Sequence, residues 1–200
     1  MRYDVLIAGV GGQGTLLTAK IIATAGLKED HFVRTSETIG MAQRGGSVVS
    51  HVRIGAKNAG SIIPLGSADL LIGFEPAEAA KNLSRVKKNG ICVVNEKPVV
   101  PVSASLKKGG YPISEIKTYL EKEAKARLVN AYDAAGEIGS YKTLNVVLLG
   151  TAFGIGALPF ERKTLEETII DLVPEKFADM NLKAFAAGIQ LGAEKEFINQ

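Results

Sequence analysis

The chain has 200 residues, 46% of them hydrophobic and 22% charged, and its 24 basic and 21 acidic residues leave a net charge of +3. These values are typical of a globular protein with a full-sized core. The charges are scattered without a basic stripe, which argues against nucleic-acid binding. One cysteine, Cys92, excludes an intrachain disulfide, a Cys-x-x-Cys pair and an iron–sulfur cluster held by this chain alone.

The amino-terminal end and the apolar runs predict a cytoplasmic chain without membrane contact. Met1 to Asp4 lead directly into an apolar strand, and no signal peptide precedes it. The longest uncharged apolar run, Val146 to Leu158, holds three glycines and is too short to cross a bilayer.

The first elements in chain order are a strand, a glycine turn and a helix. Tyr3 to Ala8 is continuously apolar from Val5 onward, as in a buried parallel strand. Gly9 to Gly14 fits G-x-G-x-x-G, and Leu16 to Leu27 has helical spacing. Glycines let the backbone approach phosphate oxygens, and a helix N-terminus offers free N–H groups. The candidates for contact with a phosphate, another anion or coenzyme A are Gly9, Gly11, Gly12, Gln13, Gly14 and Thr15. The alternative is a tight turn that binds nothing.

A polar, glycine-rich stretch follows from Ser36 to Ser47, and the sequence predicts a loop there. It is either a long surface turn or a recognition loop with polar handles at Glu37, Gln43 and Arg44. Glu37 also lies at a tolerable distance from the glycine turn for a ribose-binding acid of a dinucleotide site. No helix opens after it, however, which weakens that alternative.

The rest of the chain predicts an α/β fold with three α/β/α layers, a mostly parallel central sheet, a Rossmann-like start and a helical C-terminal part. Strands are expected at Val48 to Ile54, Asp69 to Phe74, Ile91 to Asn95 and Ala126 to Ala131. Helices are expected at Ala77 to Val86, Ser114 to Lys125, Leu144 to Leu158, Thr164 to Val173 and Asn181 to about Phe197. Asn89-Gly90 is expected to be a turn, Tyr132 to Ser140 a loop or short helix, and Thr164 with Glu167 a capping box.

Two further expectations concern how these elements assemble. The strands Tyr3 to Ala8, Asp69 to Phe74 and Ile91 to Asn95 are continuously apolar, so we expect them to be central neighbours. No repeat or long polar linker divides residues 1–200, which are therefore expected to form one domain.

The helix predicted from Leu144 to Leu158 is apolar nearly all round. Gly150 and Gly154 lie four apart and form a smooth stripe where another backbone can approach closely. Such a helix is buried in its own core or under a partner chain. Asn145, Gly150 and Gly154 are therefore candidates for packing against a partner.

Three segments together resemble one family. They are the glycine turn Gly9 to Gly14, the run Glu37 to Gly46 with the strand that follows it, and the late run Lys142 to Asn145 with Leu149-Gly150. The chain is similar over nearly its whole length to the gamma-type domain of 2-oxoacid:ferredoxin oxidoreductases. Its Met41 to Gly46 segment is the most specific element. Ile39 departs from the pattern, which has a polar residue there, often histidine.

The resemblance implies a subunit of a larger complex that oxidatively decarboxylates a 2-oxoacid, such as indolepyruvate, to an acyl-coenzyme A and reduces ferredoxin. In this family, thiamine diphosphate, Mg²⁺ and [4Fe-4S] clusters are carried by a larger catalytic partner, and coenzyme A is the co-substrate. This chain has no cysteine set, no Gly-Asp-Gly metal element and no nucleophile–base pair, so we assign it no catalytic or metal-binding residue. The expected residues of the cleft and partner interface are Glu37, Thr38, Met41, Gln43, Arg44, Gly45 and Gly46.

Two alternatives belong to other classes of protein. One is a stand-alone NAD(P)-binding oxidoreductase built on Gly9 to Gly14, and the other is an assembly module whose glycine turn is only a turn. Binding of nicotinamide by the isolated chain discriminates the first, and co-purification of a cluster-bearing chain supports the complex. An isolated subunit is expected to self-associate through its exposed apolar partner surface.

Arg44 is the residue of the loop with the most specific chemistry. Its guanidinium can form two parallel bonds to a carboxylate or phosphate, which Lys cannot reproduce. We expect Arg44→Lys to leave the thermal midpoint of the isolated chain unchanged. Ferredoxin reduction by the assembled complex should fall by about tenfold or more, from the loss of a contact worth ~1.5–3 kcal/mol. Activity within twofold of wild type at full partner occupancy would contradict this role.

Overall fold

The computed structural model describes residues 2–40, 45–100 and 111–194. The strands are β1 (Tyr3–Val10), β2 (Val33–Ile39), β3 (Ser47–Ile54), β4 (Ala68–Gly73), β5 (Val86–Asn95) and β6 (Lys125–Val129). The α-helices are α1 (Thr15–Lys28), α2 (Pro76–Asn82), α4 (Ile113–Glu123), α5 (Ala131–Ile138), α6 (Leu144–Gly154), α7 (Arg162–Leu172) and α8 (Ala178–Ala193). Short 3-10 helices are η1 (Leu83–Arg85), η2 (Tyr141–Thr143) and η3 (Glu175–Phe177).

The six strands form one sheet in the order β2-β3-β1-β4-β5-β6. β1, β4, β5 and β6 pair in parallel, so the prediction that the three most apolar strands are central neighbours is confirmed. β3 pairs antiparallel with both β1 and β2. The sheet is therefore mixed at the β2 edge and parallel elsewhere.

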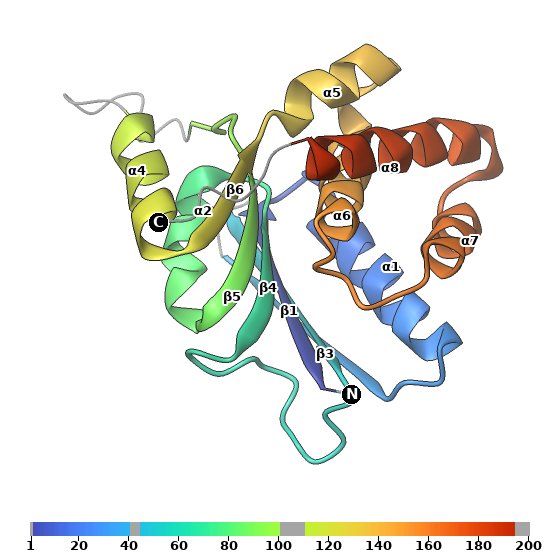
Figure 1. Ribbon diagram of the computed structural model, residues 1–200, viewed down its shortest axis with the longest axis horizontal. Helices are drawn as coiled ribbons and strands as arrows, with labels where there is room; N and C mark the ends of the chain where they lie inside the picture. Colours follow the sequence, from blue (N-terminus) through green and yellow to red (C-terminus); the bar gives the residue numbers. More distant parts are fainter. Residues whose placement is uncertain (1, 41–44, 101–110, 195–200) are drawn as a thin grey trace.

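Helices cover both faces of the sheet and give the predicted three layers (Figure 1). Alternate residues of β1 point to opposite faces, as in any strand. Val5 and Ile7 belong to the larger core, which α1 and α5 to α8 cover. Leu6 and Ala8 belong to the smaller core, which α2 and α4 cover. The continuous apolar run of β1 thus serves two cores at once.

The segment from Ser36 to Ile39 is the second half of β2, so the prediction of a loop from Ser36 onward is wrong there. Its backbone pairs with β3 from Val33 opposite Ile54 to Ile39 opposite Val48. β2 is an edge strand with mostly exposed side chains, so backbone pairing forms it without an apolar pattern. Met41, Gln43 and Arg44 lie outside the described residues.

Asn89 and Gly90 lie within β5, so the predicted turn is also wrong. The pairing of β4 with β5 shifts register between Ala68 and Leu70. A Cβ on Gly90 would lie 2.8 Å from the Ala68 carbonyl oxygen, and this close approach requires glycine.

The capping box predicted at Thr164 and Glu167 does not form, because α7 begins two residues earlier at Arg162. Its N-cap is Glu161, whose side chain makes no capping bond. The Glu161 N–H instead donates to Glu29 Oε1 at the end of α1 (2.9 Å). A contact with a distant helix therefore sets the start of α7.

α6 and α8 pack backbone to backbone through glycines. A Cβ on Gly150 would lie 2.2 Å from the Phe185 carbonyl oxygen, and one on Gly154 would lie 2.4 Å from that of Ile189. The stripe on α6 is therefore filled by α8 of the same chain, which confirms the alternative of burial in the chain's own core and corrects the assignment of Gly150 and Gly154 to a partner interface. No helix in the described ranges is long and apolar enough to cross a membrane.

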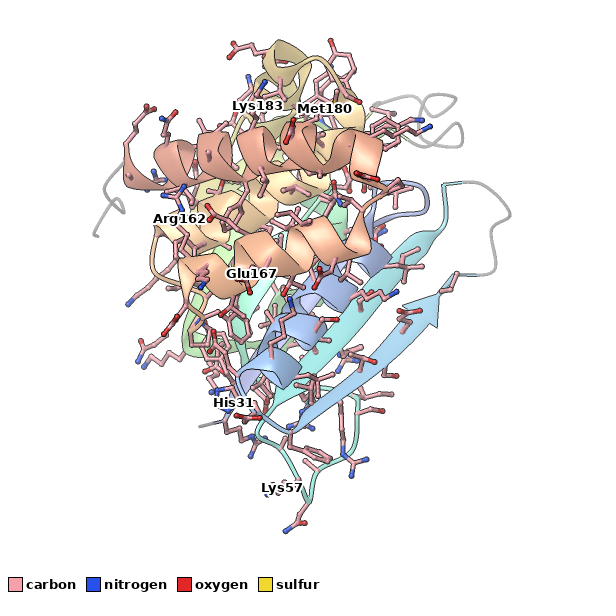
Figure 2. All side chains as sticks on the ribbon, turned by 90° about the vertical axis from the view of Figure 1, so that its right-hand side faces the viewer. His31, Lys57, Arg162, Glu167, Met180 and Lys183 are labelled. Carbon is pink, nitrogen blue, oxygen red and sulfur yellow. The ribbon has the colours of Figure 1, made fainter. Side chains whose placement is uncertain are left out.

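Figure 2 faces the helical layer that results from this packing. α8, with Met180 and Lys183, lies above α7, with Arg162 and Glu167, and α1 runs beside the uncovered β2. The Lys28 ammonium on α1 pairs with Asp171 on α7 at 2.7 Å. The carboxyl-terminal helices and α1 thus form one layer.

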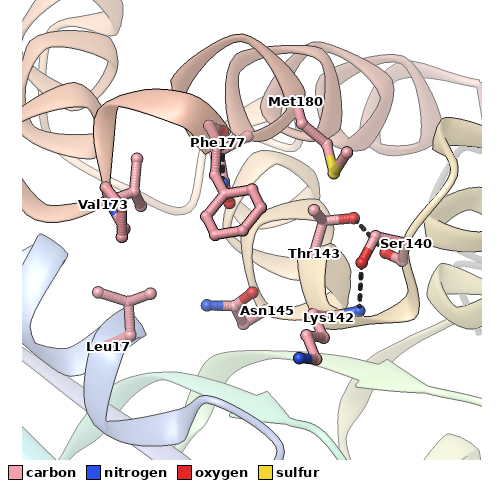
Figure 3. Close-up of a pocket in the computed structure, with 10 residues that line it drawn as sticks. Leu17, Ser140, Lys142, Thr143, Asn145, Val173, Phe177 and Met180 are labelled. Carbon is pink, nitrogen blue, oxygen red and sulfur yellow. Dashed lines mark hydrogen bonds between the residues drawn. The ribbon is translucent and has the colours of Figure 1, made fainter.

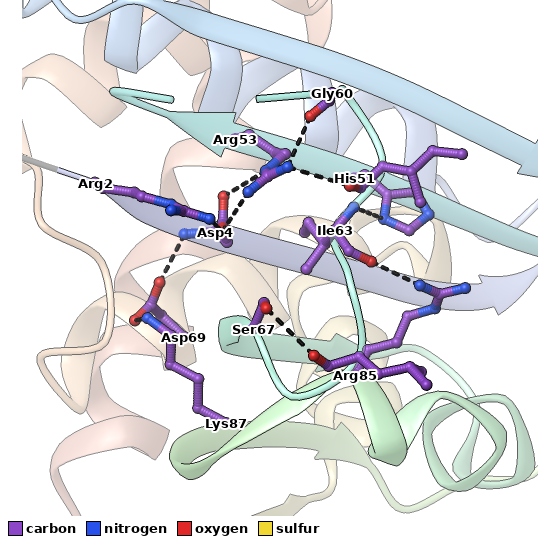
Figure 4. A network of polar contacts seen from close by, with 12 residues as sticks. Arg2, Asp4, His51, Arg53, Gly60, Ile63, Ser67, Asp69, Arg85 and Lys87 are labelled. Atoms are coloured by element: carbon purple, nitrogen blue, oxygen red, sulfur yellow. Dashed lines mark hydrogen bonds and ion pairs between the residues drawn. The ribbon is translucent and has the colours of Figure 1, made fainter. Parts of the chain in front are cut away.

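A buried polar network holds the loop between β3 and β4 at the amino end of β1 (Figure 4). The Arg53 guanidinium donates two bonds to the Asp4 carboxylate (2.8 and 3.1 Å) and a third to the Gly60 carbonyl (2.7 Å). His51 Nδ1 accepts the Ile63 N–H (3.2 Å), so His51 is a hydrogen-bonded strand residue. Burial, with Arg85 and Arg53 nearby, lowers the pKa of His51 to about 4, so it is a neutral acceptor at pH 7.

The contact between α6 and α8 predicts which glycine change the fold cannot accept. A Cβ on Gly188 would lie 2.1 Å from the Val147 carbonyl oxygen, whereas one on Gly60 would meet nothing within 4 Å. We expect Gly188→Ala to lower the free energy of unfolding by about 1–3 kcal/mol or more, because the two helices must move apart. Gly60→Ala should leave the free energy of unfolding unchanged. Urea titration of both variants measures the difference. Equal stabilities for the two variants would contradict the close packing.

Candidate functional site

The candidate site lies at the edge of the sheet where the parallel strands end. β1, β4, β5 and β6 run in one direction, and their last residues are Val10, Gly73, Asn95 and Val129. In open α/β sheets, ligands bind beyond these carboxyl ends. The glycine turn leaves β1 at this edge and opens α1.

The glycine turn needs its glycines for two different reasons. Gly12 and Gly14 have φ angles of 94° and 88°, which side-chain-bearing residues rarely adopt. Gly9 has an ordinary φ, but its Cβ would lie 2.8 Å from Phe74 Cβ. Gly11 and Gly12 are exposed, so the turn presents backbone to solvent at the carboxyl edge.

Gln13 braces the turn from within. Its Oε1 accepts the Val10 N–H (2.7 Å), and its Nε2 donates to the Phe74 carbonyl (3.3 Å). Both ends of the amide are therefore engaged with the strands beneath. This assigns Gln13 to the architecture of the turn, where the sequence predicted an anion contact.

The N–H groups of the turn divide into two sets. The Gly11 N–H donates to the Gly46 carbonyl (2.9 Å) and the Gln13 N–H to the Val10 carbonyl (3.2 Å). The N–H groups of Gly11 and Gln13 are therefore engaged within the chain, and the prediction that they contact an anion is corrected. The N–H groups of Gly12, Gly14 and Thr15 make no hydrogen bond to a described residue.

The N-terminus of α1 adds to the anion-binding character of this second set. Its N-cap, Gly14, provides no side-chain capping bond, and the 14-residue helix has no acidic residue in its first turn. The positive end of the helix dipole is therefore uncompensated by this turn. Free N–H groups at a helix N-terminus can bind a phosphate or carboxylate oxygen.

The second glycine segment contacts the turn directly. Gly46 accepts the bond from Gly11, and Gly45, with a φ of 70°, lies against Val10. Glu37 and Thr38 are exposed on β2, opposite Ser50 and Val49 of β3. The described part of the predicted interface loop thus lies at the same edge as the turn.

The position of Glu37 argues against a dinucleotide site. In that fold the acid follows a strand that pairs in parallel beside β1. Here β3 lies between β1 and β2, so Glu37 is two strands away from the strand that carries the turn. At a strand spacing of about 4.8 Å, it lies roughly 10 Å to the side.

A network of carboxylates, not foreseen from the sequence, lies beside these segments. Glu75 and Glu78 at the start of α2 are both buried. Glu78 Oε2 accepts the Ser47 hydroxyl (2.6 Å), and Glu75 accepts the Tyr111 hydroxyl. Burial raises the pKa of the Tyr111 phenol, with the Glu75 hydrogen bond as the next cause. The sequence feature that could have indicated this network is a pair of glutamates, three positions apart around Pro76, directly after a buried strand.

Asn145 lies behind the turn rather than on a partner surface. It is 2% exposed, and its side-chain atoms would be 3.1 Å from a Cβ on Gly14. Its Oδ1 makes no hydrogen bond to a described residue. It lines a pocket of ≈ 150 Å³ with Leu17, Lys142 and Phe177 (Figure 3). Asn145 therefore belongs to the rear wall of the turn.

Cofactor ligands are not evident in the described ranges. No group of three or more His, Cys, Asp or Glu side chains there is placed to hold a metal ion. The chain's single cysteine, Cys92, is buried in β5, and burial raises its thiol pKa to about 12. Cys92 is therefore a core residue without thiolate character at pH 7.

The similarity to known proteins extends over nearly the whole chain. The family model described as "Pyruvate ferredoxin/flavodoxin oxidoreductase" matches residues 4–191. A chain from Pyrococcus horikoshii named "Indolepyruvate oxidoreductase subunit IorB" is 39% identical over 99% of this chain and 98% of its own. A chain of the same name from Archaeoglobus fulgidus is 42% identical over 94% of each chain.

Solved structures share the fold at lower identity. The gamma subunit of a keto/oxoacid ferredoxin oxidoreductase from Geobacter sulfurreducens superposes with a TM-score of 0.72 and 22% identity, covering 96% of this chain and 99% of that one. The 2-oxoglutarate:ferredoxin oxidoreductase of Magnetococcus marinus gives a TM-score of 0.73 at 21% identity. It covers 99% of this chain but 32% of that larger one. The chain belongs to the pyruvate ferredoxin/flavodoxin oxidoreductase family.

Proposed function

We propose that the chain is the small, cofactor-free subunit of an oxidoreductase that acts on aryl 2-oxoacids such as indolepyruvate. The net reaction releases the carboxylate as CO₂, joins the acyl group to the sulfur of coenzyme A with release of the thiol proton to solvent, and passes two electrons to ferredoxin. Relatives that are 37–42% identical and bear the indolepyruvate oxidoreductase name support this substrate class. We also place the chain in the cytoplasm, as expected from its sequence.

The redox groups would belong to a larger partner subunit. A [4Fe-4S] cluster needs four thiolate ligands, and this chain has one buried cysteine. Thiamine diphosphate, Mg²⁺ and the clusters, when bound on the partner, supply the carbon–carbon cleavage and electron transfer. The residues of this chain would bind and orient coenzyme A and keep water out of the site.

The observation that carries the proposal is the glycine turn at the carboxyl edge of the sheet. Three of its N–H groups, those of Gly12, Gly14 and Thr15, have no acceptor in the described part of the chain. Gly12 is exposed, and a Cβ there would meet nothing within 4 Å. We assign to this turn the binding of a phosphate group of coenzyme A, because N–H groups at a helix N-terminus donate hydrogen bonds to phosphate oxygens.

Exposed apolar side chains near the same edge support docking of the partner there. Ile39 is the last residue of β2, and the others follow the ends of β1, β5 and β6 along the chain: Leu16, Val99, Val100 and Tyr141. Ile39 is the most exposed of them at 62%. Exposed apolar side chains that gather on one surface commonly mark an interaction site. Ferredoxin would be reached indirectly, through the clusters of the partner.

A pure assembly module is the second candidate, since a glycine turn that is only a turn would need no ligand. The internal bonds of Gly11 and Gln13 favour it, because they show that the turn is partly self-satisfied. Anaerobic co-purification of the larger subunit is expected for both candidates. Only the first requires coenzyme A to touch this chain.

A charge change at Gly12 separates these candidates. Gly12→Asp places a carboxylate beside the anion site, and Gly12→Asn imposes the same backbone strain without the charge. At an effective dielectric constant of about 20, two charges ~4 Å apart repel by ~4 kcal/mol. We therefore expect Gly12→Asp to raise the KM for coenzyme A at least tenfold above that of Gly12→Asn in the assembled complex.

The KM for the 2-oxoacid and the thermal midpoint provide the controls for this comparison. The KM for the 2-oxoacid should be equal in the two variants, since we assign decarboxylation to the partner. The thermal midpoint should be equal because both variants impose the same backbone strain. Equal KM values for coenzyme A would refute the assignment of the turn and leave the assembly module.

A further inference from the structure

A continuous line of hydrogen bonds runs along the carboxyl edge from the glycine turn to α2. The Gly11 N–H donates to the Gly46 carbonyl (2.9 Å), and Ser47 follows Gly46 directly in the chain. The Ser47 hydroxyl donates to Glu78 Oε2 (2.6 Å). Ser47 also pairs with Val10, the last residue of β1, so the middle of this line is joined to the strand that carries the turn.

Glu78 is a buried and fully engaged carboxylate. Its side chain is 8% exposed, and its second oxygen, Oε1, binds the Lys81 ammonium at 2.6 Å. A hydrogen bond to an ionised oxygen is shorter and stronger than one between neutral groups. The Ser47 hydroxyl is therefore held firmly, although Ser47 lies at the end of a strand next to two glycines.

Glu75 fixes the position from which Glu78 acts. As the N-cap of α2, its Oε2 accepts the Glu78 N–H (2.9 Å). Its Oε1 accepts the Tyr111 hydroxyl, whose oxygen in turn accepts the Ala77 N–H (3.1 Å). The first turn of α2 is thus tied down on both sides, and it provides a rigid base for the Glu78 side chain.

The glycine segment on the other side is held by backbone contacts at Ser47, which pairs with Val10 and whose carbonyl accepts the Gly40 N–H (2.7 Å). Gly45 and Gly46 carry no side chain, and Gly45 has a φ of 70°. Among the described residues, a Cβ on Gly45 or Gly11 would make only ordinary van der Waals contact, with Val10 at 3.9 Å and Gly46 at 3.8 Å. Glycine also loses more conformational freedom on ordering than other residues. The bond from Ser47 to Glu78 therefore adds a side-chain anchor directly after the Gly46 carbonyl, which accepts the Gly11 N–H.

We propose that Glu78 is a positioning residue for the coenzyme A site. Through Ser47 it holds the Gly46 carbonyl on the Gly11 N–H, and this bond sets the shape of the turn that presents the N–H groups of Gly12, Gly14 and Thr15. Glu78 acts through Ser47 and touches neither substrate nor cofactor. The inference rests on the proposed function of the turn.

The test is a comparison of variants in the complete complex, with coenzyme A and the 2-oxoacid each varied in turn. Ser47→Ala removes the donor and leaves Glu78 paired with Lys81, whereas Ser47→Thr keeps a hydroxyl at the same position. Glu166→Gln is the matched control for loss of a carboxylate. It removes one partner of an exposed ion pair with Arg162 on α7, far from the turn in sequence.

We expect Ser47→Ala to raise the KM for coenzyme A five- to twentyfold, with kcat and the KM for the 2-oxoacid within twofold of wild type. Ser47→Thr should restore the KM to within twofold, and Glu166→Gln should leave it unchanged. If Ser47→Ala does not fold, Glu78→Gln provides the second variant. Its amide oxygen accepts a weaker bond, so a KM increase of two- to fivefold is expected.

The outcomes distinguish this inference from the proposed function. A lower thermal midpoint for Ser47→Ala with an unchanged KM for coenzyme A would overturn the positioning role and leave a structural one. If Gly12→Asp raises that KM and neither Ser47→Ala nor Glu78→Gln does, only the inference fails. If Gly12→Asp also has no effect, the assignment of the turn fails, and the inference with it.

Discussion

The hydrogen bond from the Gly11 N–H to the Gly46 carbonyl is the contact on which the candidate site depends. It joins two glycine segments that are 35 positions apart in the chain (46 − 11). Gly11 directly follows β1, and Gly46 directly precedes β3. Because these two strands pair with each other, the sheet itself brings the segments together. The same bond engages the Gly11 N–H, so the donors of the turn without an acceptor among the described residues are the N–H groups of Gly12, Gly14 and Thr15.

The two faces of the sheet supply different supports to this edge. On the larger core side, Asn145 of α6 backs Gly14, and α6 is itself held by the glycine contact with α8. On the other side, Glu75 and Glu78 of α2 reach Tyr111 and Ser47. The polar groups at the opposite end, Asp4 and Arg53, only anchor a connecting loop. The candidate site and the anchor of this loop thus lie at opposite ends of the strands.

The local part of this arrangement could be predicted from the sequence, and the long-range part could not. A continuous apolar run, a glycine turn and a helical spacing predicted β1, the turn and α1 correctly, because each depends on neighbours in the chain. The antiparallel place of β3, the filling of the α6 stripe by α8 and the bond from Ser47 to Glu78 depend on residues far apart. Ser36 to Ile39 shows the same limit, since pairing with β3 makes a strand of a segment with no apolar pattern.

Hydrogen–deuterium exchange of the assembled complex, with and without saturating coenzyme A, tests the central claim most directly. Binding of a phosphate by the N–H groups of Gly12, Gly14 and Thr15 should slow exchange in the peptide that spans Gly9 to Thr15. Peptides from α7, on the helical layer, should exchange at the same rate in both states. Unchanged exchange in the Gly9 to Thr15 peptide at saturating coenzyme A would contradict the claim that this turn holds the ligand.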